Sequence, residues 1–214
     1  MFVRLFLNFQ LLMAFFRAVR DPNRTEEIFK ISADPRIMAG EKHEPMAAML
    51  ARSEKALEAV TSRRLGQWNT ESLSNLAPNT FGYRYYRHLK DNNLEEKFYP
   101  DISPARDIDY IRLRLRQTHD IYHVLTGFDT TVEDEAGLQA FYFAQLHVRI
   151  SPLILAIVVL HDLIYRPEFL PLLFEQINKG WNLGKKSALL FGEIFEDHFS
   201  DDLTAYRQVL SLDN

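Results

Sequence analysis

Apolar residues recur along most of this chain at intervals of three and four, which is the spacing of one face of an α-helix. In the first twenty residues this pattern predicts an amphipathic helix over residues 2–19. Its apolar positions are Phe2, Leu5, Phe6, Phe9, Leu12, Met13 and Phe16. Two placements are open for this helix: packed on the protein's own core, or lying on a membrane surface or along a lipid groove.

One short segment has the alternation of a strand. IRLRLR at residues 111–116 alternates apolar and basic residues. It lies inside a longer stripe with helical spacing, formed by Ile108, Ile111, Leu115, Tyr122 and Leu125. Because this stripe is longer than a typical strand, the sequence predicts one helix over residues 107–126. Gly127 follows it as a left-handed cap.

Turn signals separate the other predicted helices. Thr25 can cap a short helix that begins TEEIF, and a further helix is predicted over residues 45–62. The next helix begins at Thr130 or Thr131 and runs to about residue 150, with Thr130-x-x-Glu133 as a capping box. Pro152 then opens an apolar segment of about 13 residues, which predicts a buried helix rather than a membrane span. A last helical stretch, in which a break is allowed, covers residues 170–210.

These helices predict an all-α, single-domain bundle of residues 1–214, in which the helix pair over about residues 107–150 carries the candidate chemistry. The chain has 214 residues, 47% of them hydrophobic, which is enough for a substantial core. A net charge of −4 with scattered Lys and Arg argues against nucleic-acid binding. The absence of cysteine excludes thiolate chemistry and cysteine zinc sites, and it suits a cytosolic protein.

Candidate metal ligands gather in the segment RQTHDIYHVLTGFDTTVEDE, residues 116–135. On a helix His119 and His123 stand one turn apart on one face, and Asp120 lies within the same arc. A tight link then reverses the chain, so that the next helix can present one acid of Glu133, Asp134 and Glu135. Two imidazoles and two carboxylates suit zinc, and also Fe(II) or Mn(II).

The residues alone leave a second interpretation open. Acids are favoured in the first turn of any helix by its dipole, and a pair of histidines four apart also occurs by chance. Two other histidines are set aside on distance and context. His147 lies more than three turns beyond Glu135, too far to share a metal. For His161, a hydrogen-bonded core histidine is favoured over a pocket residue or an outer neighbour of the metal.

The full spacing, HD, two residues, H, eleven residues, E, resembles the signature of the coenzyme Q biosynthesis protein 4 family. It singles out Glu135 among the three acids, beside His119, Asp120 and His123. The resemblance covers most of the chain. It extends to LAPNTFGYRYYRHL at 76–89, DPNRTEEIFKISADPRI at 21–37 and the segment that follows Gly180. A bacterial member of the family or a divergent paralogue fits the sequence.

The resemblance implies an all-helical fold and a role in ubiquinone biosynthesis. Its metal would be held by His119, Asp120, His123 and Glu135, which are also the expected catalytic residues. Zinc is the usual assignment, with iron, manganese or magnesium as alternatives. The implied chemistry is decarboxylation at C1 of a polyprenylated hydroxybenzoate, in some members with hydroxylation, as an oxidative decarboxylase. The alternative is a polyprenyl-lipid-binding or scaffold protein without its own catalysis.

The resemblance also implies partners and a location. An isoprenoid tail requires a long apolar channel between helices, which the aromatic excess could supply. Other quinone-biosynthesis proteins are expected partners, and nucleic acid is not. The expected location is cytoplasmic and peripheral on the inner face of the membrane. The oligomeric state is open, and a homodimer is one option.

Overall fold

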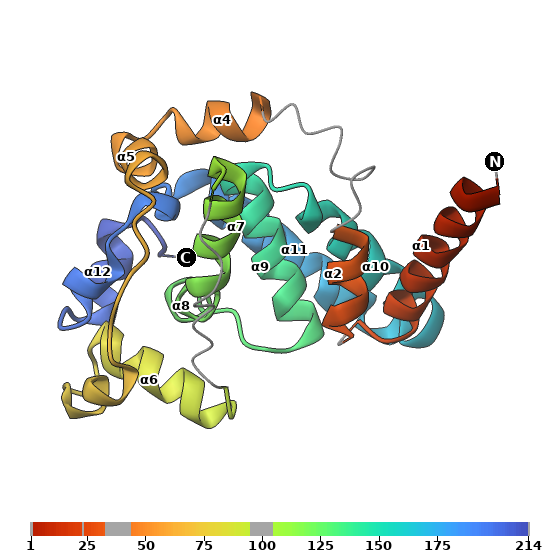
Figure 1. Ribbon diagram of the computed structural model, residues 1–214. Coiled ribbons are helices and arrows are strands. Elements are labelled where there is room, and N and C mark those ends of the chain that lie inside the picture. Colours follow the sequence, from red (N-terminus) through yellow and green to blue (C-terminus); the bar gives the residue numbers. More distant parts are fainter. Residues whose placement is uncertain (1, 23, 33–43, 95–104, 214) are drawn as a thin grey trace. The chain divides into compact units, whose positions relative to one another are not determined.

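The computed structural model describes residues 2–22, 24–32, 44–94 and 105–213 (Figure 1). Every regular element in these ranges is a helix, and no strand occurs among them. This confirms the predicted all-α class. The chain falls into two compact units, one comprising Met1–Ala47 and Thr131–Asn182, the other Ala48–Thr130 and Leu183–Asn214. The expected single domain stays a prediction, because compactness does not measure independent folding.

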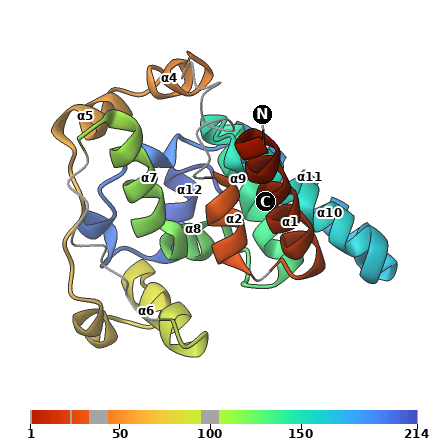
Figure 2. The same ribbon diagram turned by 45° about the vertical axis from the view of Figure 1, so that its right-hand side comes forward.

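The first unit contains α1 (Phe2–Arg20), α2 (Thr25–Ser32), α9 (Val132–Leu146), α10 (Ile150–Tyr165), the short 3-10 turn η2 (Pro167–Phe169) and most of α11 (Leu170–Lys186). Helices α1, α2 and α10 lie side by side, as both views show (Figure 1, Figure 2). The predicted N-terminal helix is therefore confirmed. The side chains of its first apolar positions, Phe2 to Phe9, lie outside the described residues.

Two apolar clusters hold the first unit together. One is formed by Ala18 and Val19 of α1, Ile28 of α2 and Ile157 of α10, all buried. Ala136, Val158 and Leu173 form the other, which joins α9, α10 and α11. In α1 the side chains of Leu12, Met13 and Phe16 are exposed. The end of the helix is therefore packed on the core, as the first of the two predicted placements has it, while contact of its exposed positions with a membrane or a lipid stays a prediction.

The second unit contains α5 (Glu54–Ser62), η1 (Thr70–Asn75), α6 (Phe81–Asp91), α7 (Asp107–Gln117), α8 (His119–Thr126), η3 (Leu190–Gly192), η4 (Phe195–His198) and α12 (Leu203–Val209), while α4 (Glu44–Leu50) crosses the boundary. Its core is aromatic. Phe81 packs against the rings of Phe195, Phe199 and Tyr206, and Tyr85 stacks on Phe199. These contacts fix α6 to the C-terminal segment.

The segment around Phe81 shows why the sequence is Thr-Phe-Gly there. Thr80 caps α6, because its hydroxyl accepts the N–H of Tyr83 at 3.4 Å. Gly82 donates its N–H to the carbonyl oxygen of Phe199 at 2.9 Å. A Cβ at Gly82 would come within 2.8 Å of that oxygen, so only glycine allows this close approach.

Several predicted boundaries were wrong. The helix expected over residues 107–126 is broken at Thr118 into α7 and α8, so the expected pair over 107–150 is three helices. The helix expected over 45–62 is two helices, the second capped by Ser53. The helix expected to reach residue 150 ends at Leu146. The break allowed between residues 170 and 210 is present, since α11 ends at Lys186.

None of the described helices is both long and apolar enough to cross a lipid bilayer. The apolar channel stays a prediction.

Candidate metal centre

The break at Thr118 determines where α8, the helix that carries His119 and His123, begins. The Thr118 hydroxyl donates to the carbonyl oxygen of Arg114 at 2.9 Å, and the residue leaves the helical region with φ −101° and ψ 5°. This bond to the preceding turn competes with regular helix geometry. The helical hydrogen bonds nevertheless continue past this residue, because Tyr122 donates its N–H to the carbonyl of Thr118 at 3.0 Å. His119 therefore stands in the first turn of α8.

A buried arginine anchors the helix that precedes α8. The Arg114 guanidinium donates to the carbonyl oxygen of Glu193 at 2.8 Å and to Oε1 of Gln117 at 2.9 Å. Gln117 in turn bonds the backbone of Gly66 through both ends of its amide. Burial of Arg114 is tolerated because its donors are paired. The alternating segment at residues 111–116 is therefore part of a helix, α7, and one of its basic residues, Arg114, anchors that helix.

His119 and His123 point their Nε2 atoms at one another across 3.3 Å. His123 is buried, and its Nδ1 lies 3.1 Å from the carbonyl oxygen of Phe128. A carbonyl oxygen only accepts hydrogen bonds, so Nδ1 carries the hydrogen and Nε2 of the neutral ring presents its lone pair. A backbone carbonyl on the far nitrogen is the usual support of a metal-binding histidine.

A short turn leads from α8 to the acids. Gly127 ends α8 with φ 74°, and its N–H bonds the carbonyl of His123 at 2.9 Å, which confirms the predicted left-handed cap. Thr131 caps α9, because its hydroxyl accepts the N–H of Asp134 at 3.2 Å. The predicted capping box of Thr130 and Glu133 is therefore wrong by one residue.

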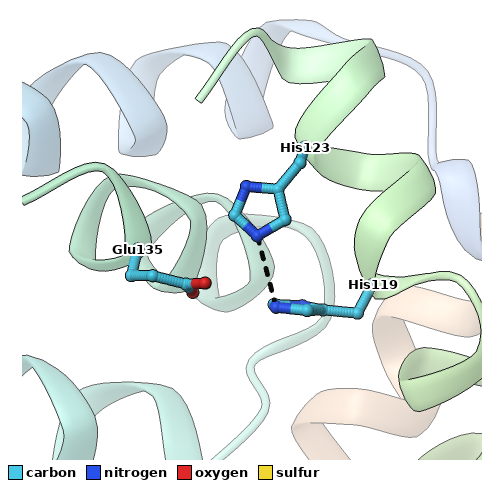
Figure 3. A group of neighbouring side chains, drawn as sticks. All are labelled: His119, His123 and Glu135. Carbon is cyan, nitrogen blue, oxygen red and sulfur yellow. Dashed lines mark hydrogen bonds between the residues drawn. The ribbon is translucent and has the colours of Figure 1, made fainter. Parts of the chain in front are cut away.

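The three acids of the first turn of α9 have different roles. The hydroxyl of Thr131 donates to the carboxylate of Asp134 at 2.9 Å. Glu133 is buried and pairs with Arg166, which also binds the fully buried Asp162 at 2.8 Å. Glu135 alone joins the two histidines in a group that could hold a metal ion. The ligand atoms of His119, His123 and Glu135 all lie within 4.8 Å of one another (Figure 3).

The chemistry of this group fits a divalent metal. Two Zn–N bonds of about 2.05 Å that meet at the tetrahedral angle place their nitrogens about 3.3 Å apart. The two Nε2 atoms have this separation. One carboxylate with two imidazoles is a donor set that suits zinc, iron or manganese. His119, His123 and Glu135 could therefore bind a metal.

Asp120, the fourth predicted ligand, does not belong to that group. Its carboxylate faces His88 of α6, with Oδ1 3.9 Å from His88 Nε2. Burial alone would raise the pKa of Asp120, but attraction to His88, and then to His119 and His123, outweighs burial and lowers it. Its role as a ligand stays a prediction.

His88 was not found by sequence reasoning. It lies on α6, and its ring stacks on that of His123 with centroids 5.3 Å apart. No spacing rule links the two positions, because only the packing of α6 against α8 brings them together. His147 and His161, the two histidines set aside in the sequence, are placed as expected. His147 is absent from the ligand group, and Nδ1 of His161 lies 2.8 Å from the carbonyl oxygen of Val19.

Comparison with known families decides the identity. The sequence profile of the family described as coenzyme Q (ubiquinone) biosynthesis protein Coq4 matches residues 4–214. The chain belongs to the Coq4 family. This confirms the resemblance read from the motif and gives the chain a role in ubiquinone biosynthesis.

Individual Coq4 relatives are distant in sequence. The ubiquinone biosynthesis protein COQ4 homolog 2, mitochondrial, of Paramecium tetraurelia is 30% identical over 144 residues, which are 66% of this chain and 68% of that protein. The mitochondrial homolog of Nematostella vectensis is 28% identical over 159 residues, 70% of this chain and 74% of its own. The Saccharomyces cerevisiae (strain RM11-1a) protein is 39% identical, but over only 36% of this chain and 24% of its own.

The Coq4 fold is also found in a solved structure. A crystal structure of a candidate ubiquinone biosynthesis protein from Nostoc punctiforme superimposes with a TM-score of 0.79 at 26% identity. The match covers 97% of this chain and 99% of that one. The helical architecture is therefore shared along nearly the whole length of both chains.

Proposed function

We propose that this Coq4 protein is a metal-dependent enzyme that acts at C1 of a polyprenylated hydroxybenzoate and removes its carboxylate. The observation that supports this most is the ligand group of His119, His123 and Glu135, in which a backbone carbonyl orients His123. A divalent metal, zinc first, would be held there. Iron, manganese and magnesium are the alternatives.

Decarboxylation breaks the bond between the ring and the carboxyl carbon, releases carbon dioxide and leaves an electron pair on the ring that takes up a proton. A bound metal supplies Lewis-acid polarisation of the substrate's carboxylate or neighbouring phenolic oxygen. Asp120 is ionised at neutral pH, since its pKa is lowered by the three nearby histidines. It can therefore accept a hydrogen bond from the substrate. Hydroxylation at C1 would in addition need an external oxidant such as dioxygen.

A second function uses the same fold without catalysis. In it the protein binds a polyprenyl lipid, or serves as a scaffold for other quinone-biosynthesis proteins, and its metal is structural. Both functions predict a bound isoprenoid, so lipid binding does not separate them. Loss of the metal separates them, because only the enzyme needs a Lewis acid at its reacting group.

The test compares Glu135→Gln with Asp134→Asn. The second variant is a matched control, because Asp134 is in the same turn and its interaction with Thr131 tolerates an amide. We expect zinc content, measured by mass spectrometry of the purified protein, to fall only in Glu135→Gln. Quinone synthesis in a complementation assay should fall with it. Full synthesis by a folded, metal-free Glu135→Gln protein would exclude the enzyme and favour the scaffold.

We also propose peripheral association with a membrane, on its cytoplasmic inner face. Its support is an exposed apolar surface in the first unit, where α10 ends and α11 begins, formed by Leu163, Ile164, Tyr165, Phe169, Leu172 and Phe174. Exposed apolar patches of this kind mark interaction sites. The hydrogen bond of His161 to Val19 joins α10 to the end of α1, where Arg20 follows Val19. Cations beside an apolar surface suit anionic lipid headgroups.

Flotation with vesicles that contain an anionic lipid tests this surface. We expect Ile164→Ser/Phe174→Ser to remain with the unbound protein, while the wild type floats. Val209→Ser is the control, because Val209 is 76% exposed but lies on α12 of the second unit. Equal flotation of all three proteins would contradict the proposed surface.

A further inference from the structure

A pocket at the junction of α1 and α2, within the first unit, is lined by charged side chains. Arg17, Arg20, Asp21 and Arg24 line it among the described residues, and its volume is about 460 Å³. Arg17 is three and four residues before Arg20 and Asp21, so these three positions share one face at the end of α1. Arg24 follows the turn, where its N–H bonds the carbonyl oxygen of Asp21 at 3.1 Å. The junction thus brings three guanidinium groups to one pocket.

The three arginines differ in the partners of their side chains. Nε and Nη2 of Arg17 lie 3.1 and 3.2 Å from the carboxylate oxygens of the buried Glu27. Nε of Arg24 lies 3.5 Å from Oδ2 of Asp21. The exposed side chain of Arg20 has no hydrogen bond or ion pair with any residue that the structure describes. Arg20 can therefore bind a ligand without giving up a contact.

The charges around the pocket do not cancel. Its lining carries three guanidinium groups against the one carboxylate of Asp21, an excess of two positive charges. Glu27 does not change this excess, because it is also bound by Lys30, whose Nζ lies 3.1 Å from its Oε1. The exposed Glu26 is in the first turn of α2 but does not line the pocket. The pocket is therefore a local centre of positive charge on a chain whose net charge is −4.

Helix dipoles account for two of the three arginines. Arg17 and Arg20 are in the last turn of α1, where the dipole of the helix favours cations. Arg24 immediately precedes α2, and the positive end of that helix disfavours a cation. Asp21 offsets this repulsion only in part, at 3.5 Å. An anion bound in the pocket would compensate both Arg24 and the unpaired Arg20.

We propose that this pocket binds a phosphate group. Guanidinium groups bind phosphate oxygens through two parallel N–H donors. A phosphate monoester carries about −1.5 to −2 charges at pH 7, which matches the excess of two positive charges better than a single carboxylate does. The phosphate belongs either to a lipid headgroup, such as that of phosphatidic acid, or to a soluble small molecule. This site goes beyond the proposed metal centre and the proposed apolar surface, and it depends on neither.

Titration calorimetry of the full chain with inorganic phosphate and with glycerol phosphate tests the pocket. Arg20→Gln should weaken binding by about tenfold, because it removes a charged hydrogen-bond donor. Arg20→Lys keeps the charge but loses the two parallel donors, so it should weaken binding by at least about threefold. Arg52→Gln is the matched control, since it removes the same charge at an exposed position outside the pocket and should bind as the wild type. Circular dichroism controls for folding.

Flotation with phosphatidylcholine vesicles, with and without phosphatidic acid, distinguishes the two sources of phosphate. Binding of glycerol phosphate in solution identifies a soluble phosphate as sufficient, whereas binding only to the vesicles with phosphatidic acid identifies the lipid headgroup. In either case Arg20→Gln should lose the interaction and Arg52→Gln should keep it. Ile164→Ser/Phe174→Ser should bind glycerol phosphate as the wild type does, so a failure of the apolar surface leaves the pocket standing.

Three results would overturn the inference while the metal centre stands. The first is a wild type that binds neither soluble phosphate nor the vesicles with phosphatidic acid. The second is equal binding by Arg20→Gln and Arg52→Gln, which would mean that the pocket is not the site. The third is binding by Arg20→Lys as tight as that of the wild type, because net charge alone would then account for the attraction.

Discussion

Gly180 should be intolerant of even the smallest side chain. It lies in the middle of α11 and faces Gly137 of α9. A Cβ at Gly180 would stand 1.9 Å from the carbonyl oxygen of Gly137 and 2.7 Å from its carbonyl carbon. Ordinary contacts of a Cβ begin at 3.4 Å, so the two helices would have to separate by about 1.5 Å. The clash is with backbone atoms, which cannot relieve it by a change of rotamer as a side chain could.

Two effects of opposite sign decide the magnitude of Gly180→Ala. Helix propensity alone favours alanine by about 1 kcal/mol. Overpacking against a rigid neighbour costs about 1–3 kcal/mol, and this contact belongs at the upper end because backbone must move. Separation of α9 from α11 also loosens the cluster of Ala136, Val158 and Leu173. We therefore expect a net loss of about 2 kcal/mol in the free energy of unfolding.

Urea denaturation followed by circular dichroism measures this loss. Asn182→Ala is the control, an exposed α11 position where alanine should change the free energy by less than about 0.5 kcal/mol. Because Gly137 is two residues from Glu135, Gly180→Ala should also weaken zinc binding. If Gly180→Ala is instead more stable by about 1 kcal/mol, propensity dominates and the close packing of α9 on α11 is refuted.

Three further predictions follow from buried charge, a helix cap and the metal. Arg166→Met leaves the buried carboxylates of Asp162 and Glu133 without their cation. We therefore expect the free energy of unfolding, measured by urea denaturation, to fall by about 3 kcal/mol. An unchanged free energy of unfolding would contradict the role of these ion pairs. The pKa of Asp202 is lowered because its carboxylate accepts the N–H of Ala205 and the amide of Asn79. Its contribution is present above the unfolded pKa of about 3.9 and is lost as the pH falls through the lower folded value. The wild type should therefore lose more stability than Asp202→Asn between about pH 6 and pH 2, and parallel pH profiles would count against the cap. Chelation should lower the melting temperature and zinc should restore it, since zinc at a hundred times its Kd stabilises the folded state by about 2.7 kcal/mol; a midpoint indifferent to both argues against a bound metal.

Periodicity predicted the helical class and the positions of most helices, because each amphipathic stripe is a local pattern. It did not predict the break at Thr118. The apolar stripe keeps its phase across that residue, and the deviation comes from one hydroxyl bonding the carbonyl of Arg114. Nor could it find His88, whose meeting with Asp120 depends on how α6 packs against α8. Local patterns therefore place the candidate ligands on helices, while tertiary packing sets their partners.

The acids at the start of α9 show what a spacing motif adds to physical chemistry. The helix dipole favours all three equally, so it cannot distinguish a ligand from a cap. Their partners distinguish them. Asp134 interacts with the capping Thr131, and Glu133 is bound by Arg166, so neither is available to a metal without breaking a contact. Glu135 is one position further round the helix, in the group with the histidines. A metal site that used Glu133 would require Asp162 and Arg166 to rearrange. The neighbouring ion pairs, as well as the motif, therefore favour Glu135 as the candidate ligand.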